Sequence, residues 1–231
     1  MNFIDILIIV LVFISGVNGL IKGFIVTAFN LAGYIAAGII AKRYYPFLAE
    51  YIKSNTDIFV KVKDWVTGKV NELIGTSQNS TNTSSILDIF KLPDGIKEGV
   101  AENIEAQNQL TGSDSSIGNI LSSSLSDIFI SIISIIIIFI LVRIALGYLI
   151  KLLDVVARLP VLKQFNKISG LFLGLLIGIL IVHIVLAIFT PIVLTSPDGI
   201  IAQTVYNSHI GQYFYTNNLI INALKENGII N

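Results

Sequence analysis

The sequence predicts an all-α membrane protein whose four transmembrane helices form two hairpins, separated by an amphipathic helical insert. Three observations carry this prediction. Of the 231 residues, 54% are hydrophobic and only 13% are charged, which is about half the charged fraction of an average soluble domain. The mean hydropathy is +0.80. The apolar residues gather in four long runs, and a helix of about 20 mostly apolar residues can cross a bilayer.

The first hairpin follows from two apolar runs at the start of the chain. The predicted hairpin is residues 1–43, with spans at 3–21 and 24–41. Because only Lys22 and Gly23 separate the two spans, the helices must run antiparallel. No basic residue precedes the first span and Lys22 follows it, which argues against a cleaved signal peptide. Lys42 and Arg43 close the second span.

A polar insert, residues 44–123, separates the hairpins. Its first part is expected to be helical because apolar residues recur at helical spacing. These residues are Ile58, Val62, Trp65, Val66, Val70, Leu73 and Ile74. Such a stripe can lie in the headgroup plane or pack on its own neighbours, and both interpretations stay open. Residues 75–85 form a Ser/Thr/Asn-rich linker, and a second short helix is expected over residues 96–104.

The second hairpin begins with the longest apolar run of the chain. It is predicted over residues 124–190, with spans at 124–150 and 168–190 and a basic connection at 161–167. Arg143 lies toward the end of the third span, where a long side chain can snorkel to the interface. The fourth span is expected to stop at Pro191, because proline cannot continue the helical hydrogen bonds.

The tail, residues 191–231, is predicted to be soluble or interfacial. It carries four aromatic residues of the kind that gather at headgroup level. They are Tyr206, Tyr213, Phe214 and Tyr215.

The charges near the span ends predict the orientation, since Lys and Arg collect on the cytoplasmic side. Lys22 lies in the first joint, and the second joint holds Lys151, Arg158, Lys163 and Lys167. The distribution predicts that both joints are cytoplasmic and that both termini and the long insert are extracytoplasmic. The basic pair that closes the second span argues the other way.

Small residues at spacing four predict close helix packing, because glycines four apart share one helix face. Gly170, Gly174 and Gly178 form a doubled G-x-x-x-G in the fourth span. Packing within the chain is favoured over a contact between two copies. The helix-packing candidates are Gly19, Gly23, Gly33, Gly170, Gly174 and Gly178.

Three polar residues fall within the spans: Asn18, Asn30 and His183. Polar side chains in a membrane are expensive and are functional candidates by default. The asparagines can hydrogen-bond across helices or line a transport path. His183 can relay a proton or can be a neutral, hydrogen-bonded core residue. No acidic residue lies deep in a span, which counts against proton-coupled transport.

The sequence predicts no enzymatic activity, no metal site and no cofactor. It contains none of the common nucleophile, zinc or phosphate-loop motifs. Its two histidines are far apart and it has no cysteine. The formal net charge is zero, so no basic field favours nucleic acid. The expected partners are the lipid bilayer and either other proteins or a second copy.

Several segments resemble one bacterial family. The first hairpin contains Asn2–Asp5, then Gly19–Phe24 (GLIKGF), then Ala28–Tyr34, and a looser match follows at Leu159–Pro160 and Phe165–Gly170. This pattern is similar to the CvpA family, the colicin V production proteins. The long insert departs from the better-known members and is similar to the form seen in Gram-positive bacteria.

The resemblance implies a multi-pass protein of the bacterial plasma membrane that is linked to colicin V production or export. It supplies no catalytic residues. The leading hypothesis is a non-enzymatic membrane factor that supports toxin production or secretion through protein partners. The alternative is a small channel or transporter with Asn18, Asn30 and His183 along its path. A third interpretation is a membrane anchor for an enzyme complex.

Overall fold

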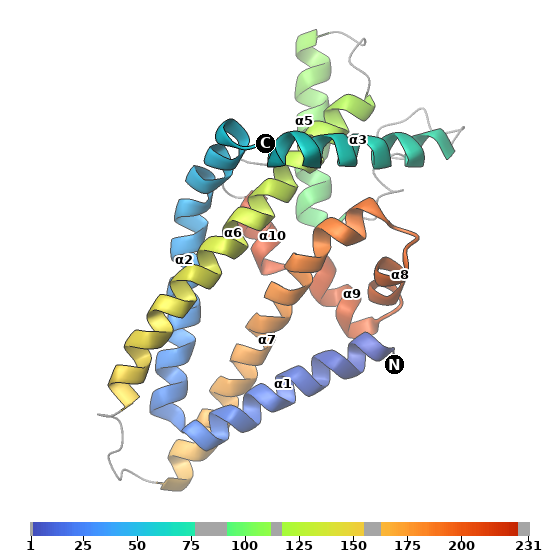
Figure 1. Ribbon diagram of the computed structural model, residues 1–231. Coiled ribbons are helices and arrows are strands. Elements are labelled where there is room, and N and C mark those ends of the chain that lie inside the picture. The colour runs from blue at the N-terminus through green and yellow to red at the C-terminus, as the bar shows by residue number, and fades with distance from the viewer. Residues whose placement is uncertain (1, 77–91, 112–116, 155–162, 226–231) are drawn as a thin grey trace.

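A computed structural model describes residues 2–76, 92–111, 117–154 and 163–225 of the chain. Every secondary-structure element in these ranges is a helix, and four of them are long and apolar enough to cross a membrane (Figure 1). These four are α1 (Phe3–Lys22), α2 (Phe24–Asn55), α6 (Ile117–Asp154) and α7 (Lys163–Thr195). The predicted fold class is therefore confirmed.

The first hairpin turns on a single glycine. Asn2 caps the start of α1, since its Oδ1 accepts the Phe3 N–H at 2.6 Å while its own N–H donates to Asp5. Gly23 ends the helix with a φ of 80° and donates its N–H to the Gly19 carbonyl at 2.8 Å. L side chains rarely adopt this left-handed conformation, so the position favours glycine, and α2 begins at the next residue.

Both α2 and α6 are longer than their predicted spans, and they pack against each other over much of their lengths. The start of α6 is rich in serine yet buried. Ser122 donates its hydroxyl to the Gly118 carbonyl at 2.7 Å, and Ser126 donates to the Ser122 carbonyl at 2.6 Å. These bonds inside the helix satisfy the hydroxyl groups, so the polar stretch can enter the core.

The helix α7 corrects two predicted boundaries. It begins at Lys163, within the predicted connection, and it passes through Pro191 to end at Thr195. A proline removes one backbone hydrogen bond. The helix continues because Val193 and Leu194, beyond the proline, are buried in the core, and the Thr190 hydroxyl bonds the Leu186 carbonyl at 2.9 Å just before it. The prediction that the helix stops at Pro191 was wrong.

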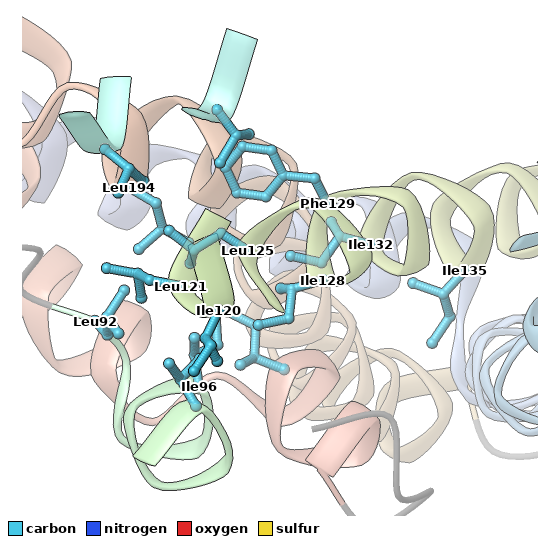
Figure 2. Close-up of a cluster of buried hydrophobic side chains, with 14 of the residues drawn as sticks. Leu92, Ile96, Ile120, Leu121, Leu125, Ile128, Phe129, Ile132, Ile135 and Leu194 are labelled. Carbon is cyan, nitrogen blue, oxygen red and sulfur yellow. The ribbon is translucent and has the colours of Figure 1, made fainter. Parts of the chain in front are cut away.

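The insert forms α3 (Ile58–Thr76) and α5 (Asp94–Thr111), which pack on the first half of α6. Figure 2 shows α6 side chains pointing toward Ile96 of α5 and Leu194 of α7. Val66 and Val70 of the predicted stripe are buried in the same cluster. The part of the stripe around Val66 and Val70 therefore packs on the protein itself. The second predicted helix, 96–104, falls inside α5.

The predicted linker and Trp65 differ from what the sequence predicts for the rest of the insert. Gly75 and Thr76, assigned to the linker, are the last residues of α3. The rest of the linker lies outside the described residues. Trp65 remains 47% exposed and its ring lies 6.2 Å from that of Phe129.

The tail folds into α8 (Ile200–Tyr206), α9 (His209–Thr216) and α10 (Leu219–Lys225). Helices α8 and α9 pack on α1 and α7, whereas α10 packs on α5 and α7. Tyr215 is buried against Val182 and Leu186 of α7, so it belongs to a core rather than to an exposed aromatic belt. Burial raises the pKa of Tyr206 to about 12 and that of Tyr215 well above its usual value. Both phenols therefore stay neutral at physiological pH.

The bundle thus has two different ends (Figure 1). At the joint end, Gly23 links α1 to α2 beside the start of α7. At the cap end, the insert helices and the three tail helices cover the bundle.

Candidate functional site

The helices α1 and α7 approach each other through glycines, in a contact that we call the glycine seam. Its residues are Gly16 and Gly19 of α1 and Gly170, Gly174 and Gly178 of α7. A Cβ built on Gly19 would overlap the Gly170 carbonyl oxygen and lie 2.9 Å from Gly174 Cα. A Cβ on Gly178 would lie 2.8 Å from Val12 Cα. Backbone atoms meet here with no room for a methyl group.

The joint end is closed by a hydrogen bond between distant residues. The Phe24 N–H at the start of α2 donates to Asn166 Oδ1 of α7 at 2.7 Å. A Cβ on Gly23 would lie 2.5 Å from Asn166 Nδ2. The buried Thr27 hydroxyl donates to the Gly23 carbonyl at 2.7 Å. Together these contacts hold the starts of α2 and α7 beside the end of α1.

Gly33, the remaining helix-packing candidate, is buried in the first third of α2. Ala37 and Ala41 are also buried, at helical spacing along the same face. This face contributes to the contacts that α2 makes with α6 and α7.

A cavity of about 140 Å³ lies beside the seam, where α1, α2, α6 and α7 meet. We call it the polar pocket. Its polar lining residues are Ser15, Asn18, Lys22, Thr27, Asn30 and Arg143. Asn18 and Lys22 are exposed and form its rim, whereas Thr27 is buried. Two of the three polar candidates in the spans therefore share one cavity.

The guanidinium group of Arg143 in α6 contacts the neighbouring helix α2. Its Nη2 donates to Asn30 Oδ1 at 2.9 Å, and its Cζ lies 4.3 Å from the centroid of the Tyr34 ring. Asn30 Nδ2 donates to the Val26 carbonyl at 2.9 Å, which turns Oδ1 toward the guanidinium. Asn30 follows Gly23 by seven residues, or about 10 Å along the helix.

The sequence suggested snorkelling for Arg143 and did not select it as a site residue. Arg143 could have been selected because it is an arginine within one span while Asn30 is an asparagine within another. In lipid, each of these side chains needs a polar partner. Only the packing of α2 on α6 shows that the two residues meet.

His183 lies elsewhere, in an apolar cavity of about 280 Å³ between α2, α6, α7 and α10. It is 6% exposed, and its ring makes an edge contact with Phe214 at 5.0 Å. Its Nδ1 lies 2.9 Å from the Ile179 carbonyl, a distance that suits an N–H donor. Asn218 donates to the His183 carbonyl at 2.9 Å. These contacts are those of a hydrogen-bonded core residue.

Asp5 joins the start of α1 to the tail in an arrangement that we call the terminal clasp. Its carboxylate is 1% exposed and accepts from the Ser208 hydroxyl at 2.6 Å and from the Ile210 N–H at 2.9 Å. Asn2 contributes two bonds, from its N–H to Asp5 at 2.7 Å and from its Nδ2 to the Thr204 carbonyl at 2.8 Å. The clasp satisfies the buried carboxylate with hydroxyl and backbone N–H donors.

Comparison with known families gives one finding. The family model described as Colicin V production protein matches residues 4–84 and 105–217. The chain belongs to this family. No curated protein and no solved structure gives a match.

The match to the Colicin V production protein family covers all four membrane-length helices except for the first residue of α1. It also covers the glycine seam, both asparagines of the polar pocket, Arg143, and the Asp5 and Ser208 partners of the terminal clasp. The unmatched internal stretch, residues 85–104, falls in the insert and includes the first part of α5. Within the insert, the match is interrupted only at this stretch, and the remaining insert residues, 44–84 and 105–123, are matched.

Proposed function

We propose that this Colicin V production family protein is a non-enzymatic factor of the bacterial plasma membrane that supports toxin production or secretion through protein partners. Family membership supports the link to the process. A partner surface is supported by the apolar side chains that α3 leaves exposed on its outward side. In this proposal the insert and the tail face the outside of the cell, and the glycine seam holds the bundle that carries them.

The helix α3 uses only part of its apolar surface to pack on α6. Val66 and Val70 are buried, but Ile58, Val60 and Trp65 are 51%, 56% and 47% exposed. The helix also carries charged residues, including the exposed Lys69–Glu72 ion pair, and it is not among the four helices that are apolar enough to cross a membrane. Exposed apolar residues among charges are typical of protein contact surfaces, and tryptophan is common at their energetic centres.

The test replaces Ile58 and Val60 by serine in a strain that lacks its own copy of the protein. We expect toxin secretion and crosslinks between the insert and partner proteins to fall, while the membrane level of the protein stays unchanged. The matched control is Phe13→Ser, which changes an apolar residue that is 65% exposed on a membrane-length helix. This control should keep the crosslinks.

Removing Asn55–Ser116 gives a stronger form of the same test. The shortened protein should still insert in the membrane but should capture no partner. The proposal fails if the shortened protein, or the double serine variant, restores every phenotype of the null strain.

A small channel or transporter is the second candidate, and the polar pocket supports it. Asn18 and Asn30 line that pocket, His183 lines the apolar cavity, and Tyr34 lines both. A solute path would have to pass Tyr34. Purified protein in liposomes, loaded with ions or small solutes, tests this: flux that increases in Tyr34→Ala supports a path, whereas no flux under any gradient removes the candidate.

A further inference from the structure

The polar pocket has an excess of positive charge. Lys22 and Arg143 line it, and none of the residues described around it is acidic. The only carboxylate buried in a described span is Asp5, which lies at the opposite end of α1 and is already bonded to Ser208 and Ile210. The chain as described therefore offers no counter-charge to the pocket.

The guanidinium of Arg143 is only partly satisfied. Asn30 accepts one of its N–H groups and the Tyr34 ring covers one face, but both partners are neutral. Its Nε is buried and has no hydrogen-bond partner among the described residues. A charged side chain at membrane depth is expensive unless it is paired. A bound anion would supply the missing pair.

The donors around the pocket suit a phosphate group. A guanidinium presents a planar set of N–H groups that matches phosphate oxygens, and an ammonium group adds a point charge. Asn18 adds an amide at the rim. The cavity of about 140 Å³ is smaller than the roughly 300–1,000 Å³ typical of pockets for drug-sized ligands. It fits a headgroup-sized anion.

We propose that the polar pocket binds the phosphate of an anionic ligand through Arg143 and Lys22. The ligand is either an anionic phospholipid of the surrounding leaflet or soluble phosphate. The exposed rim at Lys22 admits either one from the joint end, and the guanidinium holds the phosphate about 10 Å inside the bundle. This binding role goes beyond the proposed partner function and does not depend on it.

The test measures ligand retention by the purified protein in a neutral detergent. In one arm, phosphatidylglycerol competes with phosphatidylcholine of the same chains, and native mass spectrometry counts the lipids that remain bound. In the other arm, inorganic phosphate is added and the unfolding temperature is measured. We expect Arg143→Gln to lower the preference for the anionic ligand about tenfold, as loss of a charged hydrogen bond implies.

Two further variants keep the result interpretable. Arg43→Gln removes an exposed arginine of α2 that does not line the polar pocket and should leave the preference unchanged. Asn18→Asp places a carboxylate at the rim, where it competes with the ligand while leaving Arg143 in place, so the preference should again fall. This second variant tests the pocket even if Arg143→Gln does not fold.

The two arms identify the source of the phosphate. A preference for phosphatidylglycerol that depends on Arg143 assigns the site to a lipid headgroup, and stabilisation by inorganic phosphate that depends on Arg143 assigns it to the soluble ion. The proposal is overturned if neither ligand binds, or if the preference is the same in the wild type and in Asn18→Asp.

Discussion

Substituting Gly170 by alanine tests whether the glycine seam determines the stability of the bundle. A Cβ at this position would overlap the Gly19 carbonyl oxygen and lie 2.8 Å from the Gly23 carbonyl carbon. Backbone atoms cannot rotate away as a side chain can. To restore an ordinary contact, from 2.8 Å to 3.4 Å, α1 and α7 must separate by at least about 0.6 Å.

Separating α1 from α7 lowers the stability of the bundle by an amount that can be estimated. A radial gap of about 0.5–1 Å loses a quarter to a half of each van der Waals contact, and in lipid such contacts are a main attraction between helices. Overpacking of this kind typically costs about 1–3 kcal/mol. Because both helices meet through backbone atoms here, we expect Gly170→Ala to lower the free energy of unfolding by about 2–3 kcal/mol, at the upper end of this range.

The assay is equilibrium unfolding in mixed micelles with increasing sodium dodecyl sulfate, followed by helical circular dichroism. The matched control is Gly38→Ala on α2, where no atom lies within 4 Å of an added Cβ. Alanine favours a helix over glycine by about 1 kcal/mol, so this control should be neutral or slightly stabilising. Equal stabilities of the two variants would refute the close packing of α1 on α7.

Two more predictions concern the ends of the bundle. A protein with Asp5→Cys and Ser208→Cys should form a disulfide on mild oxidation, because Asp5 Oδ1 and Ser208 Oγ lie 2.6 Å apart in the native protein. A protein with Asp5→Cys and Lys167→Cys should form none, because these residues lie at opposite ends of the bundle. A crosslink in the second pair, or none in the first, would contradict the terminal clasp. Asn166→Ala should lower stability by about 1 kcal/mol in the same micelle assay, since the Phe24 N–H loses its cap; no change would mean that the bond is dispensable.

The four spans could be predicted from the sequence because their signal is local. A run of about 20 apolar residues is enough to indicate a span, and the helical period assigns residues to a face. The extents of α2 and α7 could not be predicted, because they depend on contacts with the insert and the tail. Helix α7 passes through Pro191 since Val193 and Leu194 beyond it are buried in the two main clusters.

The polar contacts were harder to predict because they join residues far apart in the chain. Arg143 meets Asn30 across 113 positions, and Ser208 meets Asp5 across 203. Neither pairing leaves a periodic signal in one segment. What the sequence does show is that each of these residues is polar in an apolar setting and needs a partner, without saying which partner.

The membrane arrangement can be tested directly by labelling single cysteines, since the native chain has none. Ser54→Cys lies near the cap end and Lys167→Cys near the joint end, and both positions are exposed. With a thiol reagent that cannot cross the membrane, we expect Ser54→Cys to react in intact cells and Lys167→Cys to react only after permeabilisation. Reaction of both cysteines in intact cells, or of neither, would contradict a bundle whose two ends lie on opposite sides of the bilayer.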